Sequence, residues 1–588
     1  MSVIFIMLGT LIVSIVRRER PETVVAVNLI AWLGATVVMA AATGGFQGWG
    51  FLTLLFLVIP SLIVILIVCA VYSFWHSKSM DKSAPEEQPK KQQREGRIGV
   101  WAAVIAVALI ATNWPMVLRL GDTVERIVYT EEQLKERDTR EWQKNRAAHL
   151  ERYASSFSGG SGTEEDPFLV SNAAELAAVR DVTSGYYGYD IHYIQIADID
   201  LSQAHPNADG GFWEPIGNQE YRFAGNYDGG GYAIYGLRLC APQMQESEEQ
   251  SPYPFDYAAI GLFGRAENAS LKNIRIEAPE FEDNYDYAAC VGFLAGNASG
   301  CRIENCSVRA QRLTNTGVTG GLLGMADDSE ISRCEAIVEE MDVEEIAGGL
   351  LGLTEYGGGG IFDCKSSTTI RSFGMGDNAY GEVGGLAGVF HGWDIARCSA
   401  QIRIIREEKG GVCTIGGLVG NLSLRSGEAL RDCFAVGSIE TANQAETAKG
   451  EPMAGGLAGN LYHTSILRSY AVVSISGIAA SPDEGQMLGS LVGLYDYEDD
   501  RYTGRHTIRQ CYYSAASGSY GPVGVCGEQD DDGVLTPYSN PVEDSKQIEA
   551  IALNEVEMRH SESFSGFDFE TVWAMDTENP AGYPLLKF

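Results

Sequence analysis

Gly348-Gly-Leu-Leu-Gly352 is one copy of a five-residue phrase that recurs, in steps of 28 to 39 residues, down the second half of this 588-residue chain. A second phrase follows each copy: an Ile or Leu, two mostly polar residues and usually a cysteine, as in Ile361-Phe-Asp-Cys364. The cysteine position comes ten residues after the last glycine in five of the eight copies and 12, 13 and 18 residues after it in the others. Two phrases in fixed order, eight times over, predict a repeat array whose short units bury apolar residues only by stacking on one another. The first phrase ends at Gly264, Gly296, Gly324, Gly352, Gly388, Gly420, Gly459 and Gly493, and the second carries Cys306, Cys334, Cys364, Cys398, Cys433 and Cys511.

The local pattern within each repeat is that of β-strands. Cys306 and Val308 are two residues apart, which places both on one face of a strand, and residues 399–405 and 470–476 continue the alternation. The glycines suit a corner of a coil, where either a positive φ or the close approach of the next coil excludes a Cβ. Leucine-rich repeats are shorter, and the blades of a propeller must close a ring, which irregular steps would disturb. We therefore expect a mainly β fold: a parallel β-helix (β-solenoid) of about eight coils with N- and C-terminal caps.

These phrases resemble the GLUG repeat of bacterial surface proteins, and segments before the first repeat resemble the opening of such domains. The resemblance covers roughly residues 159–588 and implies a parallel β-helix on the cell surface. It says little about activity, because such repeats accompany many different partners. The opening segments are residues 159–168, 169–180, 194–201, 213–217 and 223–232, and residues 564–588 resemble the closing segment.

Four apolar runs precede the repeats, at residues 1–16, 23–43, 51–75 and 98–118. The last three are long enough to cross a bilayer. A cleaved signal peptide is the alternative for the first run, but its positive charges should precede the apolar stretch, whereas Arg17, Arg18 and Arg20 follow it. We expect a four-helix transmembrane region at residues 1–118.

Loop charges predict the orientation of the chain in the membrane. Arginines 17, 18 and 20 and the Lys- and Arg-containing loop 76–97 should lie in the cytoplasm, so everything after residue 118 is expected outside the cell.

The domains after the membrane region follow from local sequence features. A helical stalk and a flexible Gly-Ser joint are expected at residues 119–158 and just beyond. A short helix is expected at 173–182, with Asn172 as N-cap and Glu175 in a capping box. The remaining predicted domains are an N-terminal cap with the first β elements at 159–240, the repeats at 241–515 and a C-terminal capping segment at 516–588.

The charge of the chain excludes some partners. The formal net charge is −35, and residues after Tyr153 hold 26 Lys and Arg against 64 Asp and Glu, a charge near −38. Such a surface repels nucleic acid and anionic lipid. The densest carboxylate groups, at residues 496–500 and 530–533, lack the ligand spacing of an EF-hand calcium loop and are expected to be solvated surface.

The repeated cysteines are expected to be free thiols. They should stack at the strand separation of about 4.8 Å with parallel Cβ vectors, which the twisted geometry of a disulfide does not fit. Ser469 replaces one of them, as a small interior residue could. No CxxC spacing indicates zinc, so no metal or cofactor is predicted, whereas Cys290, Cys301 and Cys526 stay open to pairing.

No catalytic motif is evident. None of the eight histidines begins the His-Glu-x-x-His of a zinc peptidase, and no Gly-x-Ser-x-Gly lies between a strand and a helix. A β-helix glycosidase would need two carboxylates roughly 5–9.5 Å apart on adjacent coils. The best-placed candidates are Asp327 and Asp328 after the third phrase, and His391 and Asp394 after the fifth.

The sequence leads to three hypotheses. The first is a non-enzymatic protein, anchored in the lipid bilayer through residues 1–118, that displays an acidic β-solenoid outside a bacterial cell for adhesion or for recognition of a glycan or protein ligand. The second is a carbohydrate-active enzyme, a polysaccharide lyase or hydrolase, with its substrate in a groove along the solenoid. The third is a membrane sensor. Carboxylates facing each other across a groove beside an Arg or Lys would favour the second hypothesis, and a flat, loop-covered face the first.

Overall fold

The structure is a computed structural model, and the chain falls into two compact units, residues 1–143 and 144–588. The part of the chain that it describes comprises residues 131–183, 188–202, 211–241, 258–282, 289–315, 317–354, 359–373, 381–407, 413–425, 428–441, 453–477, 487–496, 507–516, 520–529, 535–537, 548–576 and 582–587. Within that part, no helix combines the length and the apolar character needed to cross a bilayer. The four predicted membrane spans, and the acidic stretches 497–500 and 530–533, lie outside the described residues.

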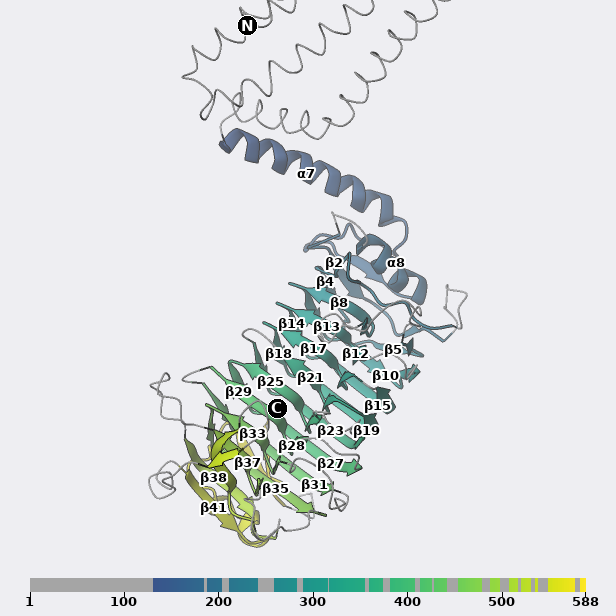
Figure 1. The fold of residues 1–588 in the computed structure, drawn as a ribbon. Coiled ribbons are helices and arrows are strands. Elements are labelled where there is room, and N and C mark those ends of the chain that lie inside the picture. The colour runs from purple at the N-terminus through teal and green to yellow at the C-terminus, as the bar shows by residue number, and fades with distance from the viewer. Residues whose placement is uncertain are drawn as a thin grey trace, which may run out of the picture. The chain divides into compact units, whose positions relative to one another are not determined.

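The second unit is mainly β, with parallel strands stacked coil upon coil as in a parallel β-helix (Figure 1). Each repeat contributes four strand positions, which form four rows along the stack. The first row is β7(Ala258–Ile260), β12(Ala289–Gly292), β16(Val318–Gly320), β20(Ile346–Gly348), β24(Gly381–Gly384), β28(Cys413–Gly416), β32(Met453–Gly455) and β36(Leu488–Gly489). The second row is β8(Phe263–Glu267), β13(Ala295–Ser299), β17(Leu323–Asp327), β21(Leu351–Thr354), β25(Ala387–Gly392), β29(Val419–Leu424), β33(Ala458–Tyr462), β37(Val492–Asp496) and β39(Val523–Gln529), which pairs with the antiparallel β40(Leu535–Pro537).

The third and fourth rows belong to one large sheet. The third row is β9(Ser270–Lys272), β14(Arg302–Glu304), β18(Glu330–Ser332), β22(Gly360–Phe362), β26(Asp394–Ala396), β30(Ala429–Arg431) and β34(Ser465–Leu467). The fourth row is β10(Arg275–Glu277), β15(Ser307–Asn315), β19(Glu335–Val343), β23(Lys365–Phe373), β27(Ser399–Glu407), β31(Phe434–Thr441) and β35(Tyr470–Ser476), and the long β38(Ile508–Ser514) and β41(Ile548–Leu553) end the sheet.

Register between coils keeps equivalent residues of the repeat in contact. Ile303 pairs with Ile331, which pairs with Ile361, and all three are fully buried or nearly so. The phrase leucines, such as Leu350, lie in the same core. One continuous hydrophobic interior therefore runs through the repeats, and apolar burial there is the main favourable term in folding.

The repeat glycines are required by close approach. A Cβ on Gly296 would lie 2.1 Å from the backbone N of Ile260 and 2.4 Å from the carbonyl C of Ala259, both in the first row of the preceding coil. The positive φ lies instead at the residue before each cysteine position, with values of 46 to 55°, where Asn, Asp, Arg or Gln turns the chain from the third row into the fourth. Of the two explanations that the sequence left open for the phrase glycines, the structure selects the approach of the neighbouring coil.

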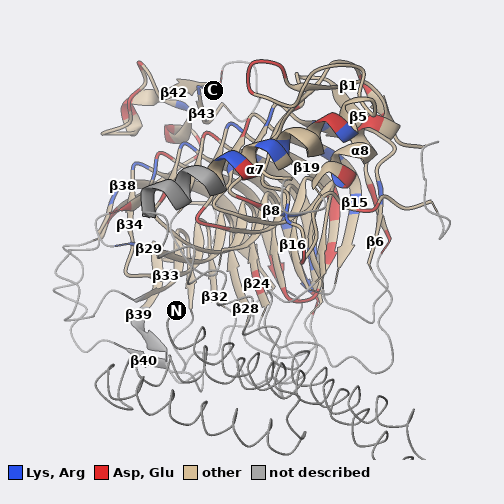
Figure 2. Cartoon of the chain, turned by 90° about the horizontal axis from the view of Figure 1, so that it is seen from above, with Lys and Arg blue, Asp and Glu red and all other residues tan. Residues whose placement is uncertain are grey.

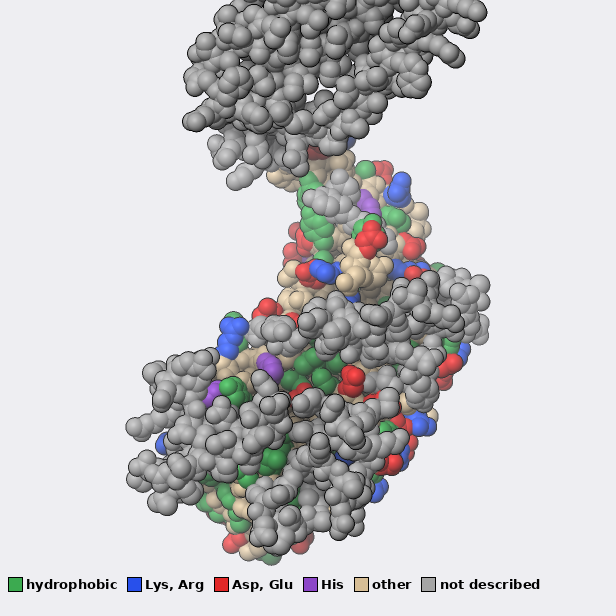
Figure 3. Space-filling view, viewed as in Figure 1, with side chains coloured by type: hydrophobic (Ala, Val, Ile, Leu, Met, Phe, Trp, Pro, Cys, Tyr) green, Lys and Arg blue, Asp and Glu red, His purple; other side chains and the backbone are tan. Residues whose placement is uncertain are grey.

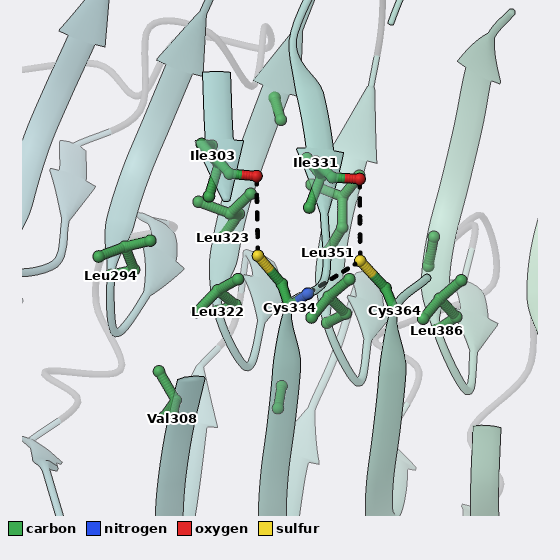
Figure 4. Close-up of a cluster of buried hydrophobic side chains, with 14 of the residues drawn as sticks. Leu294, Ile303, Val308, Leu322, Leu323, Ile331, Cys334, Leu351, Cys364 and Leu386 are labelled. Atoms are coloured by element: carbon green, nitrogen blue, oxygen red, sulfur yellow. Dashed lines mark hydrogen bonds between the residues drawn. The ribbon is translucent and has the colours of Figure 1, made fainter. Parts of the chain in front are cut away.

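The repeated cysteines line the interior as free thiols (Figure 4). The Sγ of Cys334 lies 3.8 Å from the carbonyl O of Ile303 in the preceding coil, and the backbone N–H of Cys334 donates to the Sγ of Cys364 at 3.3 Å. Each thiol thus links neighbouring coils through backbone groups, while Cys290 and Cys301 are buried cysteines outside any disulfide bond.

The N-terminal end of the stack is covered by α8(Ala173–Thr183), as predicted, together with the strands β1(Phe168–Val170), β2(His192–Gln195), β3(Ile199–Asp200), β4(Asn226–Asp228), β5(Ala233–Tyr235) and β6(Arg238–Cys240), the last paired with β11(Glu280–Glu282). The Oδ1 of Asn172 accepts from the backbone N–H of Ala174 and Glu175, which confirms the N-cap. The Glu175 carboxylate reaches back one residue further than in an ordinary capping box, to the N–H of Ser171 at 2.6 Å.

The expectation of a solvated stalk and a flexible joint needs correction for the residues after 143. Helix α7(Glu131–Ala154) buries Leu150 in the core, and His149 Nε2 lies 2.9 Å from the carbonyl O of Val182. The Gly-Ser segment is held by backbone bonds, including Gly162 N–H to the carbonyl of Asp166 at 3.0 Å. The helix end and the joint therefore belong to the N-terminal cap, because apolar residues and backbone groups there have partners.

The C-terminal segment packs against the side of the last coils. Trp573, Phe564 and Phe567 contact an outward-facing aromatic ladder that includes Phe434 and Tyr470, whose rings stack at 5.1 Å. Strands β42(Trp573–Met575) and β43(Pro584–Leu586), joined to the stack through short 3₁₀ turns at Glu557–Arg559 and Ser561–Ser563, lie outside the rows in Figure 2. The expected cap at this end is thus a lateral cover on the fourth row.

Candidate binding surface

The residues that the sequence singled out as chemical candidates all lie on one edge of the stack, where the second row turns into the third. Asp327 ends β17 and Asp328 follows it with φ 49°, whereas His391 and Asp394 lie on β25 and β26, two coils further on. At about 4.8 Å per coil, the two groups are separated by about 10 Å along the stack. The structure therefore brings His391 and Asp394 together on one coil but does not pair either with Asp327.

Asp394 is a buried carboxylate held by an inter-coil ion pair. Its Oδ2 lies 2.5 Å from Nη2 of Arg431 on β30, while its Oδ1 is buried without a hydrogen-bond partner. Burial raises the pKa of Asp394 above its usual value, against the opposing effect of Arg431, and the nearby Glu428 raises it further. Two further pairs connect successive coils at the next corner: Asp363 with Arg397 at 2.5 and 2.8 Å, and Asp432 with Arg468 at 2.8 Å for both bonds.

An exposed indole stands beside this carboxylate. Trp393 is 52% exposed, more than any other large aromatic side chain in the described residues. The Cζ of Arg425 lies 5.4 Å from the centroid of its ring. The backbone N–H of Arg425 donates to the carbonyl of Gly392 at 3.0 Å, so the arginine is anchored to the residue that precedes the tryptophan. Trp393 and Arg425 are therefore presented as a fixed pair.

The second row carries a polar ladder next to this pair. Register places His391 beside Ser423 and Ser423 beside Tyr462, which is 41% exposed. The ring of Tyr462 meets the ring of His463 edge-on at 4.0 Å. We call Trp393, Arg425, His391, Ser423 and Tyr462 the aromatic edge.

Sequence reasoning missed a second group of carboxylates, on the first row. Burial raises the pKa of Glu345 to about 6, with Glu344 adding to the shift, and burial also raises the pKa of Glu382. The Glu382 carboxylate accepts from Nδ2 of Asn421 at 2.8 Å, across the seam between the first and second rows. The glycine phrase brings the first and second rows close together, and this approach removes water from the Glu345 and Glu382 side chains. An acidic residue just before the phrase is therefore the sequence signal for a buried carboxylate.

An apolar strip fills part of the same seam. Val318 and Ile346 on the first row contact Met325, Leu353 and Val389, whose side chains point outward from the second row. Figure 3 shows hydrophobic side chains on the face that carries β17, β21 and β25, with histidine to one side and acidic side chains to the other. The face combines aromatic, amide and carboxylate groups, the mixture with which proteins bind polar ligands that have flat apolar faces.

The residues of the repeat phrases serve the fold. The eight phrase glycines lie where the first and second rows approach, and the six repeat cysteines lie in the interior. Within the described residues, no cluster of His, Cys, Asp and Glu has the arrangement of a metal site. The expectation that the chain uses no cofactor remains a prediction.

Comparison with known proteins gives distant homology to a membrane protein. No family model matches the chain, so membership of the GLUG family stays a prediction. A protein of Evansella cellulosilytica, described by name as a Gly-rich membrane protein, is 36% identical over 156 residues, which are 26% of this chain and 16% of that protein. Halomucin of Haloquadratum walsbyi is 26% identical over 161 residues, which are 26% of this chain and 2% of halomucin. The chain thus matches less than a fifth of the length of either relative.

Solved structures give a weaker likeness. A crystal structure described as an immunoglobulin A1 protease from Bacteroides ovatus has a TM-score of 0.33 and 15% identity, over 73% of this chain and 95% of that one. An IgA1 protease gives a TM-score of 0.31 and 14% identity, over 68% and 25%. Likenesses of this size carry no argument about activity.

Proposed function

We propose that this chain is a membrane-anchored surface protein whose β-solenoid binds an extracellular glycan or protein ligand through the aromatic edge, without catalysing a reaction. The observation that carries the proposal is the exposed pair of Trp393 and Arg425, fixed on the turn between two rows. Trp, Tyr and Arg dominate the energetics of recognition surfaces, and here an exposed Trp and an exposed Arg lie side by side.

The ion pairs of the edge support a binding role over a catalytic one. Asp394, Asp363 and Asp432 each form an ion pair with an arginine of the neighbouring coil, so these carboxylates already have a partner within the stack. A glycosidase needs one carboxyl group free to give up a proton and a second one near it. The membrane anchor rests on the apolar runs of residues 1–118 and on the relative described as a membrane protein.

The second candidate function is a carbohydrate-active enzyme with its acids on the first row. Burial raises the pKa of Glu345 to about 6, which is the range that a general acid needs near neutral pH, and Glu382 lies on the next strand of the same row. Within the described residues, no observation bears on the third hypothesis, a membrane sensor.

One experiment on the full chain in detergent or nanodiscs tests both functions. The chain is applied to an array of glycans and matrix proteins, and polysaccharide breakdown products are measured in parallel. We expect binding that is lost in Trp393→Ala but kept in Tyr235→Ala, since Tyr235 is another exposed aromatic residue (40% exposed) and lies on the N-terminal strands. Absence of any ligand would reject the proposal. Product release that disappears in Glu345→Gln would establish the enzyme instead.

A further inference from the structure

We propose that the aromatic edge binds a sugar ring carrying one anionic group, a carboxylate or a sulfate, with the ring on Trp393 and the anion on Arg425. This inference rests on the proposed function and specifies its ligand. Its first support is the charge of Arg425, which forms no ion pair with a carboxylate of the described residues.

Arg425 is an exception among the arginines of its surroundings. Arg397, Arg431 and Arg468 on the same side of the stack each form an ion pair with an aspartate. Arg425 forms none with the carboxylates of the described residues, although the chain has 78 acidic residues against 43 basic ones. An exposed guanidinium in such an acidic protein would gain from almost any neighbouring carboxylate, so its free state keeps five donors for a ligand.

The position of Arg425 fits an anion attached to a stacked ring. The guanidinium lies at 5.4 Å over the indole, and half of that indole is open to solvent. A sugar ring that packs an apolar face on the open part of the indole would place its ring substituents beside the guanidinium. The planar guanidinium fork binds a carboxylate or sulfate through two parallel hydrogen bonds, which gives direction as well as strength.

The surrounding charge limits the ligand to few charges. Arg425 contributes one positive charge to a part of the chain, the residues after Tyr153, whose formal charge is near −38, and exposed Glu428 follows it closely. A densely charged polymer would meet this net repulsion along its whole length. A neutral chain with an occasional acidic unit, or with one at its end, avoids that cost while keeping the contact with Arg425.

The test compares three probes that separate ring stacking from charge recognition. The first is a trisaccharide of galacturonic acid, the second is its full methyl ester, and the third is a neutral trisaccharide with a single sulfate. Calorimetry measures their binding to the full chain in nanodiscs. Variants are Arg425→Gln and Trp393→Ala, with Arg403→Gln as the matched control, because Arg403 is an exposed arginine paired with Glu440 on the fourth row.

We expect the free acid to bind about tenfold more tightly than its ester, since hydrogen bonds to charged groups contribute about that factor. Arg425→Gln should remove the difference, Trp393→Ala should remove binding of both sugars, and Arg403→Gln should change neither. The sulfated probe shows whether the anion must be a carboxylate: equal binding extends the site to sulfate, and weaker binding restricts it to carboxylate.

Two results would overturn the inference. Equal affinity for acid and ester, unchanged by Arg425→Gln, would leave a binding surface without charge recognition. Tightest binding of a heavily sulfated polymer would contradict the limit on charge. Neither result affects the proposed function, which fails when no glycan or protein on the array binds, or when Trp393→Ala leaves that binding unchanged.

Discussion

The stacked repeat cysteines predict an unusual order of stability for two substitutions at Cys433. Its Sγ accepts the backbone N–H of Cys398 at 3.4 Å and lies 3.1 Å from the carbonyl O of Arg431. In the next coil, Ser469 makes the same two contacts, accepting from the N–H of Cys433 at 3.1 Å and donating to the carbonyl of Leu467 at 2.9 Å. We expect Cys433→Ser to be more stable than Cys433→Ala, the reverse of the order in an apolar core, where a buried hydroxyl is costly.

The magnitude follows from the contacts that each variant keeps. Alanine leaves the buried N–H of Cys398 without an acceptor, which costs about 1–3 kcal/mol, and removes a buried sulfur worth about 1 kcal/mol. Serine keeps both hydrogen bonds and loses only the apolar contribution, so its cost stays within about 1 kcal/mol. The difference between the two variants should therefore be about 1–3 kcal/mol.

Amide hydrogen exchange measures the loss of this hydrogen bond directly at the backbone N–H of Cys398. Opening of the coil around Cys398 should become about thirtyfold more frequent in the alanine variant, the factor that corresponds to about 2 kcal/mol, and should change little in the serine variant. Guanidinium unfolding, followed by tryptophan fluorescence, gives the global change. A serine variant that is less stable than the alanine variant would refute the idea that the cysteines contribute through backbone hydrogen bonds.

Three further predictions test other parts of the structure. Gly296→Ala should cost about 3 kcal/mol in unfolding free energy because its Cβ would meet only backbone, whereas Gly521→Ala, where the nearest atom is 3.6 Å away, should stay within about 0.5 kcal/mol. Burial raises the pKa of Cys511 to about 12, so the contribution of this thiol to stability is complete below the unfolded thiol pKa near 8.5 and is lost as pH rises from there towards 12. The unfolding midpoint should therefore fall between these pH values, and it should fall less in Cys511→Ser. The pKa of Glu345 is raised from 4.5 to about 6, so Glu345→Gln should be more stable than the native chain at pH 7 by about 2 kcal/mol. This gain should vanish below pH 4.5, and unfolding followed across this pH range measures it.

The strands of the repeats could be predicted because their spacing and their alternation agree. Residues 399–405 and 470–476, predicted as extended, lie in β27 and β35. The stacked parallel sheets follow from the fixed order of the two phrases. The sequence could not decide between positive φ and close approach at the glycines, since either explains the missing side chain. Asn and Asp before the cysteine position, as in Asn305 and Asp363, indicate the positive φ of this corner, because these residue types adopt it more readily than most.

Contacts between coils could not be predicted from the sequence because they depend on the register in which one coil pairs with the next. Asp394 and Arg431 are 37 positions apart in the chain, and only the lengths of the intervening turns decide whether they meet. The same holds for Glu382 and Asn421, whose burial arises from the seam between two rows. The position of His391 and Asp394 on an edge could be predicted without knowing the register, since a polar residue after a strand lies on the turn that follows. That Asp394 would be buried and paired there could not be read from its neighbours.

The irregular steps of the repeat carry information that a perfect repeat would lack. From Gly420 to Cys433 the chain takes 13 residues where the preceding coil takes ten, and the three additional residues lie in the sequence between Leu424 and Glu428. Arg425 is the first of these three residues, and its guanidinium lies over the indole of Trp393 in the preceding coil. Deleting residues 425–427 restores the spacing of ten, so that Glu428 takes the place of Trp393 in the repeat.

We expect this deletion to keep the fold and abolish recognition. The strands on either side, β29 and β30, already pair in register with β25 and β26, so a shorter turn of the length used in five other coils should be tolerated, with an unfolding midpoint close to that of the native chain. Acid-sugar binding should fall at least as far as in Arg425→Gln, because the cation is removed altogether. An unfolded deletion variant would show that the insertion serves the fold, and unchanged binding by a folded one would place recognition elsewhere on the stack. On this proposal, length variation within the repeat, rather than the repeated residues, is the part of the sequence that specifies a ligand.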